Sequence, residues 1–210
     1  MDLNTKINFC KNDLNDNLFN IYQKSSYLAV DTEAMGLVHG RDRLCVIQIS
    51  NEDNITAYIK LEINNTNSDR VKLLFENDQI KKIFHFARFD VAALKCNLQI
   101  NTRNIFCTKI ASKLARTYTN KHGLKDLVHE LVKVELDKGC QSSDWGSEND
   151  FSKEQIEYAT NDVRYLIEAM EKLVVILKRE KRYELAEQCF SVIPIYSELD
   201  IRKFSNIFEH

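Results

Sequence analysis

Asp31 and Glu33 stand two positions apart, directly after the apolar run Tyr27–Val30. An apolar run of this length beside a glycine-containing turn predicts a buried strand, and side chains two positions apart on a strand project from the same face. Two neighbouring carboxylates repel each other unless a proton or a cation lies between them. A hard divalent cation with oxygen ligands, Mg²⁺ or Mn²⁺, suits such a pair. Taken alone, the pair is also compatible with a turn cap beside a solvated carboxylate.

Two further stretches carry side chains that could join this pair. Asp90 follows the predicted strand Lys82–Phe86, and ligand sites form just past the carboxyl ends of strands in α/β sheets. Tyr158 and Asp162 are four positions apart on a predicted helix and therefore share one helical face. Each stretch has a structural alternative: Asp90 as a first-turn carboxylate that favours the helix dipole, and Tyr158 as a packed aromatic side chain.

Strand and helix signals predict the scaffold that would position these residues. The strand-like runs are Tyr27–Glu33, Leu44–Ser50, Ile55–Leu61, Lys82–Phe86 and Ile105–Cys107. Apolar spacing predicts a short helix capped by Asp13, then helices at Val71–Phe75, Phe89–Asn97, Thr108–Tyr118, from Gly123, from Ser152 to Glu180 and after Tyr183, with an irregular tail from Pro194. The first three strands read as an antiparallel meander. This pattern predicts an α/β fold with a mixed five-stranded sheet flanked by helices and a helical C-terminal half.

Composition limits the class of protein. With 210 residues and one proline, the sequence predicts a single domain over residues 1–210. The formal net charge of −2 gives no global electrostatic basis for gripping a long nucleic acid. The polar N-terminus and the lack of a long apolar run argue against a signal peptide and a membrane span. The six cysteines have no metal-binding or paired spacing, so we expect a reducing compartment and a cytoplasmic protein.

In order, spacing and residue type, three stretches of this sequence resemble the motifs of the DEDDy 3′-5′ exonucleases: Asp31-x-Glu33, Asp90 and Tyr158-x-x-x-Asp162. That family has a ribonuclease H-like fold. Further stretches look specifically like ribonuclease D: Lys138, Ser143-Asp144-Trp145 and the block from Glu157 to Leu166. The sequence ends where ribonuclease D would continue into helical accessory (HRDC) domains, so none is expected. Within the family, Ala34–Leu37 and His85–Asp90 are similar to the compact nanoRNase C enzymes of alphaproteobacteria.

The resemblance implies a hydrolase that uses two divalent cations, Mg²⁺ or Mn²⁺. The implied catalytic residues are Asp31, Glu33, Asp90, Tyr158 and Asp162. In this interpretation Asp31 bridges both ions, Glu33 and Asp162 complete the shell of one, and Asp90 holds the other through water. An unperturbed tyrosine is a poor base at neutral pH, so the Tyr158 hydroxyl is assigned to orienting the attacking water.

Residues beside the three motifs are candidates for holding the substrate. Gly36 allows the backbone to approach a ligand closely, Leu37 resembles the wedge leucine of oligoribonuclease, and Phe86 could stack on a base. The full set is Thr32, Met35, Gly36, Leu37, His85, Phe86, Arg88, Lys109, Arg116 and His122. The alternatives are core positions for Leu37 and Phe86 and solvated surface positions for the basic residues.

The resemblance also implies a substrate and an assembly. The expected activity is hydrolysis of short single-stranded RNA, down to dinucleotides, to nucleoside 5′-monophosphates. A ribonuclease D-like enzyme acting on longer RNA and a DNA exonuclease are the enzymatic alternatives. A catalytically inactive nucleic-acid-binding module is the non-enzymatic one. The tail Ile193–His210 resembles that of nanoRNase C, which implies a homo-oligomer and, more specifically, an octameric ring.

Overall fold

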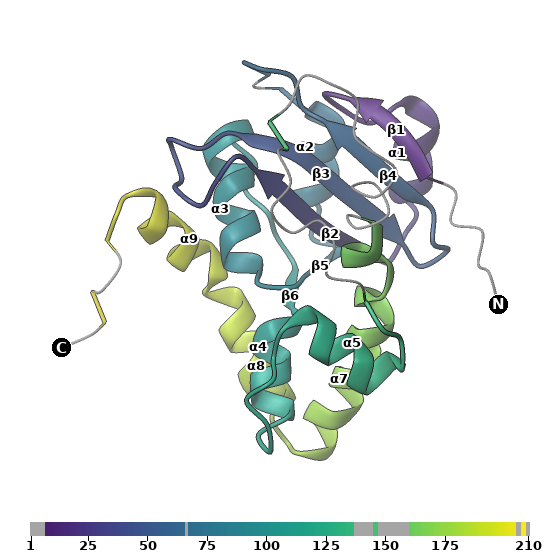
Figure 1. The fold of residues 1–210 in the computed structure, drawn as a ribbon, viewed down its shortest axis with the longest axis vertical. Coiled ribbons are helices and arrows are strands. Elements are labelled where there is room, and N and C mark those ends of the chain that lie inside the picture. The colour runs from purple at the N-terminus through teal and green to yellow at the C-terminus, as the bar shows by residue number, and fades with distance from the viewer. Residues whose placement is uncertain (1–6, 66, 137–144, 147–159, 205–206, 209–210) are drawn as a thin grey trace.

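The computed structural model describes residues 7–65, 67–136, 145–146, 160–204 and 207–208. At its centre lies a mixed sheet in the order β1-β4-β3-β2-β5-β6 (Figure 1). The strands are β1 (Ile7–Lys11), β2 (Tyr27–Ala34), β3 (Leu44–Asn51), β4 (Thr56–Lys60), β5 (Lys81–Phe84) and β6 (Ile105–Cys107). β3 runs antiparallel to both of its neighbours, and the other pairs are parallel. The predicted α/β class and mixed sheet are confirmed.

The sheet has six strands rather than the predicted five, and the additional strand is β1. Every residue of β1 pairs with β4, from Ile7 opposite Thr56 to Lys11 opposite Lys60. β1 lies at an edge of the sheet, and all of its side chains are at least partly exposed. Because main-chain pairing holds this strand, it does not need the apolar run by which strands are recognised in a sequence.

Helices cover the sheet and form the lower half of the molecule in Figure 1. They are α1 (Asp16–Tyr22), α2 (Asp69–Phe75), α3 (Ala87–Leu98), α4 (Thr108–Ala115), α5 (Leu124–Val132), α7 (Leu166–Arg179), α8 (Tyr183–Ser191) and α9 (Ile193–Ile201). α4 and α8 contact β6, and α7 contacts β2 and β5. Among the helices of the described ranges, none combines the length and apolarity needed to cross a membrane.

From Val30 onward, the alternation of side chains along β2 separates the apolar core from a polar face. Leu28 and Val30 are fully buried in the main apolar cluster. Asp31 and Glu33 project from the other face, where both are half-buried. Thr32 lies on the same face as the core residues, and its hydroxyl donates a hydrogen bond of 2.7 Å to a carboxylate oxygen of α3. β2 therefore presents polar groups toward both layers of the fold.

Asp13 caps a different helix from the one predicted. The N-cap of α1 is Asn15, whose side chain accepts a hydrogen bond from the Leu18 N–H. The Asp13 carboxylate accepts hydrogen bonds from the main-chain N–H groups of Arg70 and Val71, at the start of α2. A partner so distant in sequence cannot be inferred from local spacing.

Two further helix boundaries differ from the prediction. The helix expected from Ser152 to Glu180 is interrupted at Tyr165, which separates the helical residues 160–164 from α7. Residues 147–159 lie outside the described ranges. Pro194 begins no irregular tail but occupies the first turn of α9, where the missing N–H of proline breaks no helical hydrogen bond.

α9 runs beside α3 (Figure 1) and fixes it to the C-terminal part of the fold. Arg88 of α3 pairs with Asp200 through two hydrogen bonds, from Nε at 2.5 Å and from Nη2 at 2.6 Å. Ser197 Oγ donates to the carbonyl oxygen of Arg88 at 2.9 Å. Bidentate pairs of this kind fix geometry as well as adding stability. The position of α3 matters because this helix carries Asp90.

Candidate metal centre

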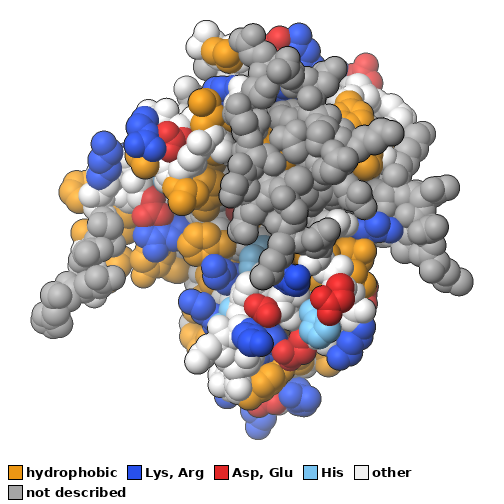
Figure 2. Space-filling view, viewed as in Figure 1, with side chains coloured by type: hydrophobic (Ala, Val, Ile, Leu, Met, Phe, Trp, Pro, Cys, Tyr) orange, Lys and Arg blue, Asp and Glu red, His pale blue; other side chains and the backbone are white. Residues whose placement is uncertain are grey.

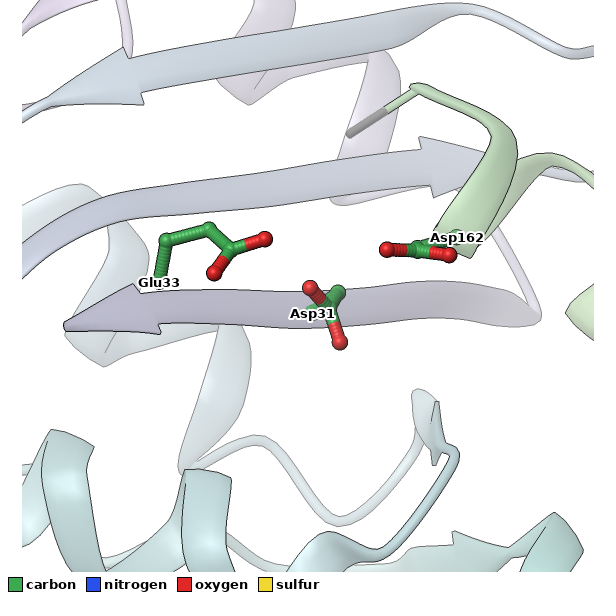
Figure 3. A group of neighbouring side chains, drawn as sticks. All are labelled: Asp31, Glu33 and Asp162. Atoms are coloured by element: carbon green, nitrogen blue, oxygen red, sulfur yellow. The ribbon is translucent and has the colours of Figure 1, made fainter. Parts of the chain in front are cut away.

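Three carboxylates converge beside the sheet. Asp31 and Glu33 project from β2, and Asp162 comes from the helical turn before α7 (Figure 3). One oxygen of each lies within 4.8 Å of the others. Oxygen atoms at this spacing could hold a hard divalent cation. The fold thus joins two of the three motifs singled out in the sequence, and we call these residues together with Asp90 the acidic cluster.

Asp90 acts on this cluster from α3. Its side chain is 5% exposed in the first turn of the helix, and it accepts the hydrogen bond from the Thr32 hydroxyl. After burial itself, the charge of Asp90 is the strongest influence that raises the pKa of Asp31. The motif that contains Asp90 therefore lies beside the other two motifs. The Thr32 hydroxyl, predicted to contact the substrate, orients Asp90 in this structure.

Burial and mutual repulsion disfavour negative charge in the acidic cluster. Burial first, and then the charges of the other three carboxylates, raise the pKa of Asp31 well above its usual value. Burial and the neighbouring charges raise the pKa of Glu33 to about 8. Burial raises the pKa of Asp90 to about 7, against the opposing effect of the Thr32 hydrogen bond. Such a group of carboxylates is stabilised by protons or by cations, and its all-oxygen donor set fits Mg²⁺ or Mn²⁺.

Gln48 is a buried partner of Asp31 that the sequence analysis did not single out. It lies opposite Asp31 in the β2–β3 register, and its side chain has no exposed surface. Assigned so that its amide nitrogen faces β2, Gln48 donates to the Asp31 carbonyl oxygen at 2.8 Å and to Asp31 Oδ2 at 3.2 Å. A polar residue within the apolar run Leu44–Ile49 was the available signal.

The loop between β2 and β3 carries three of the predicted substrate-binding residues. Met35 is 61% exposed and Leu37 is 80% exposed, so neither belongs to the core. Gly36 lies so close to the Asp42 side chain that a Cβ at this position would overlap with its carboxylate. Large apolar side chains that stand in solvent beside a polar cluster mark a surface suited to ligand contact.

His85, Phe86 and Lys109 lie where β5, α3 and α4 meet. Phe86 is 48% exposed and has a φ of +88°, a left-handed conformation that is rare for a bulky residue and tends to occur at functional sites. Lys109 Nζ lies 4.4 Å from the centre of the Phe86 ring, within cation–π range. Burial, followed by the charge of Lys109, lowers the pKa of His85 to about 4, so this imidazole is neutral at physiological pH. All three residues stay candidates for substrate contact.

Both arginines predicted to bind phosphate have partners within the fold. The Arg116 side chain has no exposed surface, pairs with Glu130 and donates to Ser112 Oγ at 2.9 Å. Arg88 forms the ion pair with α9 described above. In this structure both arginines hold helices together, and their contact with phosphate stays a prediction. His122 is partly exposed, and its Nδ1 lies 2.9 Å from the same Ser112 hydroxyl.

Tyr158 lies outside the described residues, so its role stays a prediction; the same holds for Lys138, Ser143 and Asp144. Trp145 is described and is buried against Tyr58 of β4. The pKa of Tyr58 is raised by burial and next by the charge of Glu33. Trp145 therefore packs on the same layer of the molecule as the acidic cluster.

A model of the 3′-5′ exonuclease family matches residues 7–178, which include all four residues of the acidic cluster. The chain belongs to this exonuclease family. The matched span runs from β1 into α7, so it covers the whole sheet and every element that supplies a carboxylate. The predicted resemblance to ribonuclease D-like exonucleases is confirmed.

Known relatives place the chain more closely within the family. Ribonuclease D of Sphingobium indicum is 32% identical over 166 residues, which cover 79% of this chain and 42% of that protein. The chain spans about two-fifths of the length of the first ribonuclease D relatives it matches. The structure of Brucella melitensis NrnC is 43% identical with a TM-score of 0.93, and the match covers 98% of both chains. That protein has also been solved bound to pGG and with bound Mg²⁺.

Proposed function

We propose that this protein is a metal-dependent 3′-5′ exonuclease that hydrolyses short single-stranded oligoribonucleotides, down to dinucleotides, to nucleoside 5′-monophosphates. The observation that carries the proposal is the convergence of Asp31, Glu33 and Asp162 within 4.8 Å in a chain of the exonuclease family. Carboxylates with strongly raised pKa values in a partly open cluster are typical of functional sites. The Mg²⁺ bound by Brucella NrnC supports the choice of cation.

The acidic cluster would hold two divalent cations, Mg²⁺ or Mn²⁺. Asp31, Glu33 and Asp162 would bind one, and Asp31 with Asp90 would bind the other. When bound, such cations activate a water molecule and stabilise the charge on the attacked phosphate. The water oxygen would attack the phosphorus of the last phosphodiester linkage, the bond from that phosphorus to the 3′-oxygen of the preceding nucleotide would break, and this oxygen would take up the proton that the water gives up. A nucleoside 5′-monophosphate leaves, and the strand is one nucleotide shorter.

Neighbouring side chains prepare this reaction. The Gln48 amide orients Asp31, and the Thr32 hydroxyl orients Asp90. We assign the Tyr158 hydroxyl to positioning the attacking water, since tyrosine is a weak base at neutral pH.

Exposed side chains near the cluster supply candidate contacts for the substrate. Leu37 on the β2–β3 loop would meet a terminal base. Phe86 would support a base face, for which stacking contributes about 1–3 kcal/mol. Lys109, which lies against the Phe86 ring, and the partly exposed His122 are the candidate phosphate contacts.

The distribution of charge supports a short substrate. The formal net charge is −2, and Figure 2 shows acidic and basic side chains interspersed over the helical part of the face in view. Arg88 and Arg116 are engaged in ion pairs within the fold. These two arginines are then not available for a long phosphate backbone, which nucleic-acid-binding proteins grip mainly through Lys and Arg. Binding of pGG by Brucella NrnC supports the same conclusion.

A ribonuclease D-like activity on longer RNA is the second candidate, because the chain shares 32% identity with a ribonuclease D. DNA is the alternative nucleic acid, and a catalytically inactive binding module is the alternative class. One assay distinguishes these alternatives from the proposed function. Labelled RNA and DNA of two, five and about twenty nucleotides are incubated with Mg²⁺, Mn²⁺ or a chelator. The matched variants are Asp162→Asn and Asp53→Asn, which removes an exposed carboxylate from the β3–β4 turn.

We expect metal-dependent release of mononucleotides, fastest from the RNA dinucleotide, lost in Asp162→Asn and retained in Asp53→Asn. Faster turnover of the long RNA would favour the ribonuclease D-like reading. Binding without hydrolysis in either metal would indicate the inactive module.

The remaining expectations concern organisation. We propose a single domain over residues 1–210, a cytoplasmic location and a homo-oligomer, with an octameric ring as its specific form. Exposed apolar side chains from the N-cap of α9 onward support an assembly: Val192, Ile195, Phe204, Ile207 and Phe208. Light scattering coupled to size-exclusion chromatography measures the number of subunits, and a mass of a single chain across the accessible concentration range would contradict this part of the proposal.

A further inference from the structure

The loop between β2 and β3 is built around the side chain of Asp42. Its Oδ2 accepts a hydrogen bond of 2.9 Å from the Val38 N–H, while the Asp42 N–H donates to the Val38 carbonyl oxygen at 2.9 Å. Arg41 donates to both carboxylate oxygens, from Nε at 2.7 Å and from Nη2 at 2.8 Å. The Asp42 side chain is only 12% exposed, although it belongs to a surface loop. The carboxylate is thus enclosed by the loop that it organises.

Gly36 belongs to the same arrangement. A Cβ at this position would overlap with the Asp42 carboxylate and lie 2.9 Å from its Cγ. The φ of Gly36 is not positive, so the requirement is for space rather than for an unusual backbone conformation. The residue that follows Gly36 is Leu37, so the packed carboxylate sits directly beside the backbone that presents this leucine.

The loop is also fixed at its base and at its tip. The Met35 N–H donates to the Arg43 carbonyl oxygen at 3.0 Å. The His39 ring packs on Phe89 of α3, with 5.1 Å between ring centroids. Leu37 nevertheless stands 80% exposed. A leucine in solvent gains no stability from burial, so the backbone that presents it must be held by other contacts, and those of Asp42 are the nearest.

We propose that Asp42 is a positioning residue for substrate recognition, which holds the β2–β3 loop so that Leu37 meets a terminal base of the substrate directly beside the acidic cluster. This inference rests on the proposed function, because it takes the exonuclease substrate as the ligand of Leu37. Asp42 itself touches no substrate. Its effect is to order the loop in advance, so that binding does not have to supply the entropy cost of ordering.

The test is a double-variant cycle of Asp42→Ala and Leu37→Ala. For each protein, KM and kcat are measured on pGG with Mn²⁺, and Kd for pGG is measured in chelator. We expect each single variant to raise KM and Kd about tenfold, within the range of a lost base contact, while kcat changes less than about threefold. The KM and Kd of the double variant should not exceed those of the single variant with the larger values, because Asp42 acts through Leu37. Asp53→Asn, in the β3–β4 turn, should leave all three constants unchanged.

Gly36→Ala is a second route to the same result that leaves the charge of Asp42 in place. The added methyl group displaces the carboxylate, so KM should rise as it does in Asp42→Ala. Combined with Asp42→Ala, the same substitution should have little further effect, since the group that it would overlap with is gone. Thermal unfolding of every variant reports whether the fold is retained. If Asp42→Ala fails to fold, Gly36→Ala and Leu37→Ala still test the positioning role.

Two outcomes are distinguishable. An unchanged Kd in Asp42→Ala, or losses that add fully in the cycle, would overturn the positioning role while wild-type cleavage of pGG upholds the proposed function. Failure of the wild-type protein to cleave pGG in either metal would refute the proposed function itself.

Discussion

At the level of single residues, Asp31 and Asp90 of the acidic cluster each accept a hydrogen bond from a neighbouring side chain. Gln48 donates to Asp31 from the neighbouring strand, and Thr32 donates to Asp90 from the opposite face of β2. The hydrogen bond from Thr32 lowers the pKa of Asp90, but burial outweighs it. These hydrogen bonds orient the two carboxylates but do not neutralise them. The cluster therefore still needs protons or cations for its stability.

Asp31→Asn tests this balance directly. The amide keeps the shape of the side chain and removes a carboxyl group whose ionisation is disfavoured by burial and by three neighbouring carboxylates. We expect exonuclease activity to fall at least about a thousandfold, since the members of one catalytic unit fail together. In metal-free buffer the melting temperature should rise by roughly 2–4 °C for each kcal/mol of relieved repulsion. Calorimetry with chelator and with Mn²⁺ measures the second effect; equal melting temperatures for variant and wild type in chelator would contradict it, and Asp53→Asn is the control.

Tyr158→Phe separates the hydroxyl of this residue from its ring. Phenylalanine keeps the packing volume and removes only the oxygen assigned to the attacking water. We expect kcat to fall about a hundredfold, in the range of one positioned proton-transfer or water-orienting group, with KM changed little. Steady-state kinetics on pGG provide the measurement. A kcat of the variant equal to that of the wild type would show that the hydroxyl has no role in catalysis.

At the level of elements, β5 contains an ionisable group without exposed surface. Lys82 Nζ donates to the carbonyl oxygens of Asn77 at 2.6 Å and Ile80 at 2.7 Å. Burial lowers the pKa of Lys82 to about 7, far below its value in an unfolded chain. Between these two values the unfolded state binds more protons than the folded state. The free energy of unfolding should therefore increase as pH rises from about 7 toward 10.

Lys82→Met should remove this pH dependence. The expected slope from one such group is at most about 1.4 kcal/mol per pH unit. Denaturant unfolding at several pH values measures it, and the difference between variant and wild type isolates the contribution of Lys82. Lys81→Met, at a half-exposed neighbouring position, should keep the wild-type slope. A variant with the same slope as wild type would show that Lys82 stays charged in the folded protein.

The sequence predicted elements whose signal is local and missed those that depend on distant partners. β2, β3 and β6 were recognised because their apolar runs are continuous, and the motif spacing located Asp31, Glu33 and Asp90. β1 and the capping of α2 by Asp13 rest on contacts across the fold. The ion pair of Arg116 with Glu130 was missed because Glu130 becomes its neighbour only when α4 and α5 pack. A basic residue in a loop looks the same in sequence whether it binds phosphate or a carboxylate.

At the level of the whole molecule, the distribution of charge limits how substrate affinity responds to salt. For single strands the slope of log K against log salt is about −0.7 for each phosphate neutralised. If only one or two phosphates are gripped, the slope stays near −1, and RNA of two, five and ten nucleotides should bind with similar affinity. Titrations with Asp162→Asn protein across a salt series measure both quantities. Affinity and slope that grow together with length would support the ribonuclease D-like alternative.

The alternation along β2 has a consequence for how this protein tolerates insertions and deletions. Leu28 and Val30 face the core, whereas Asp31 and Glu33 face the site. One residue inserted between Leu28 and Asp31 would rotate the rest of the strand by half a turn, sending both carboxylates into the apolar layer and Thr32 onto the catalytic face. Two inserted residues would restore the original facing. Tolerance to length changes in this strand should follow odd and even numbers rather than the size of the change.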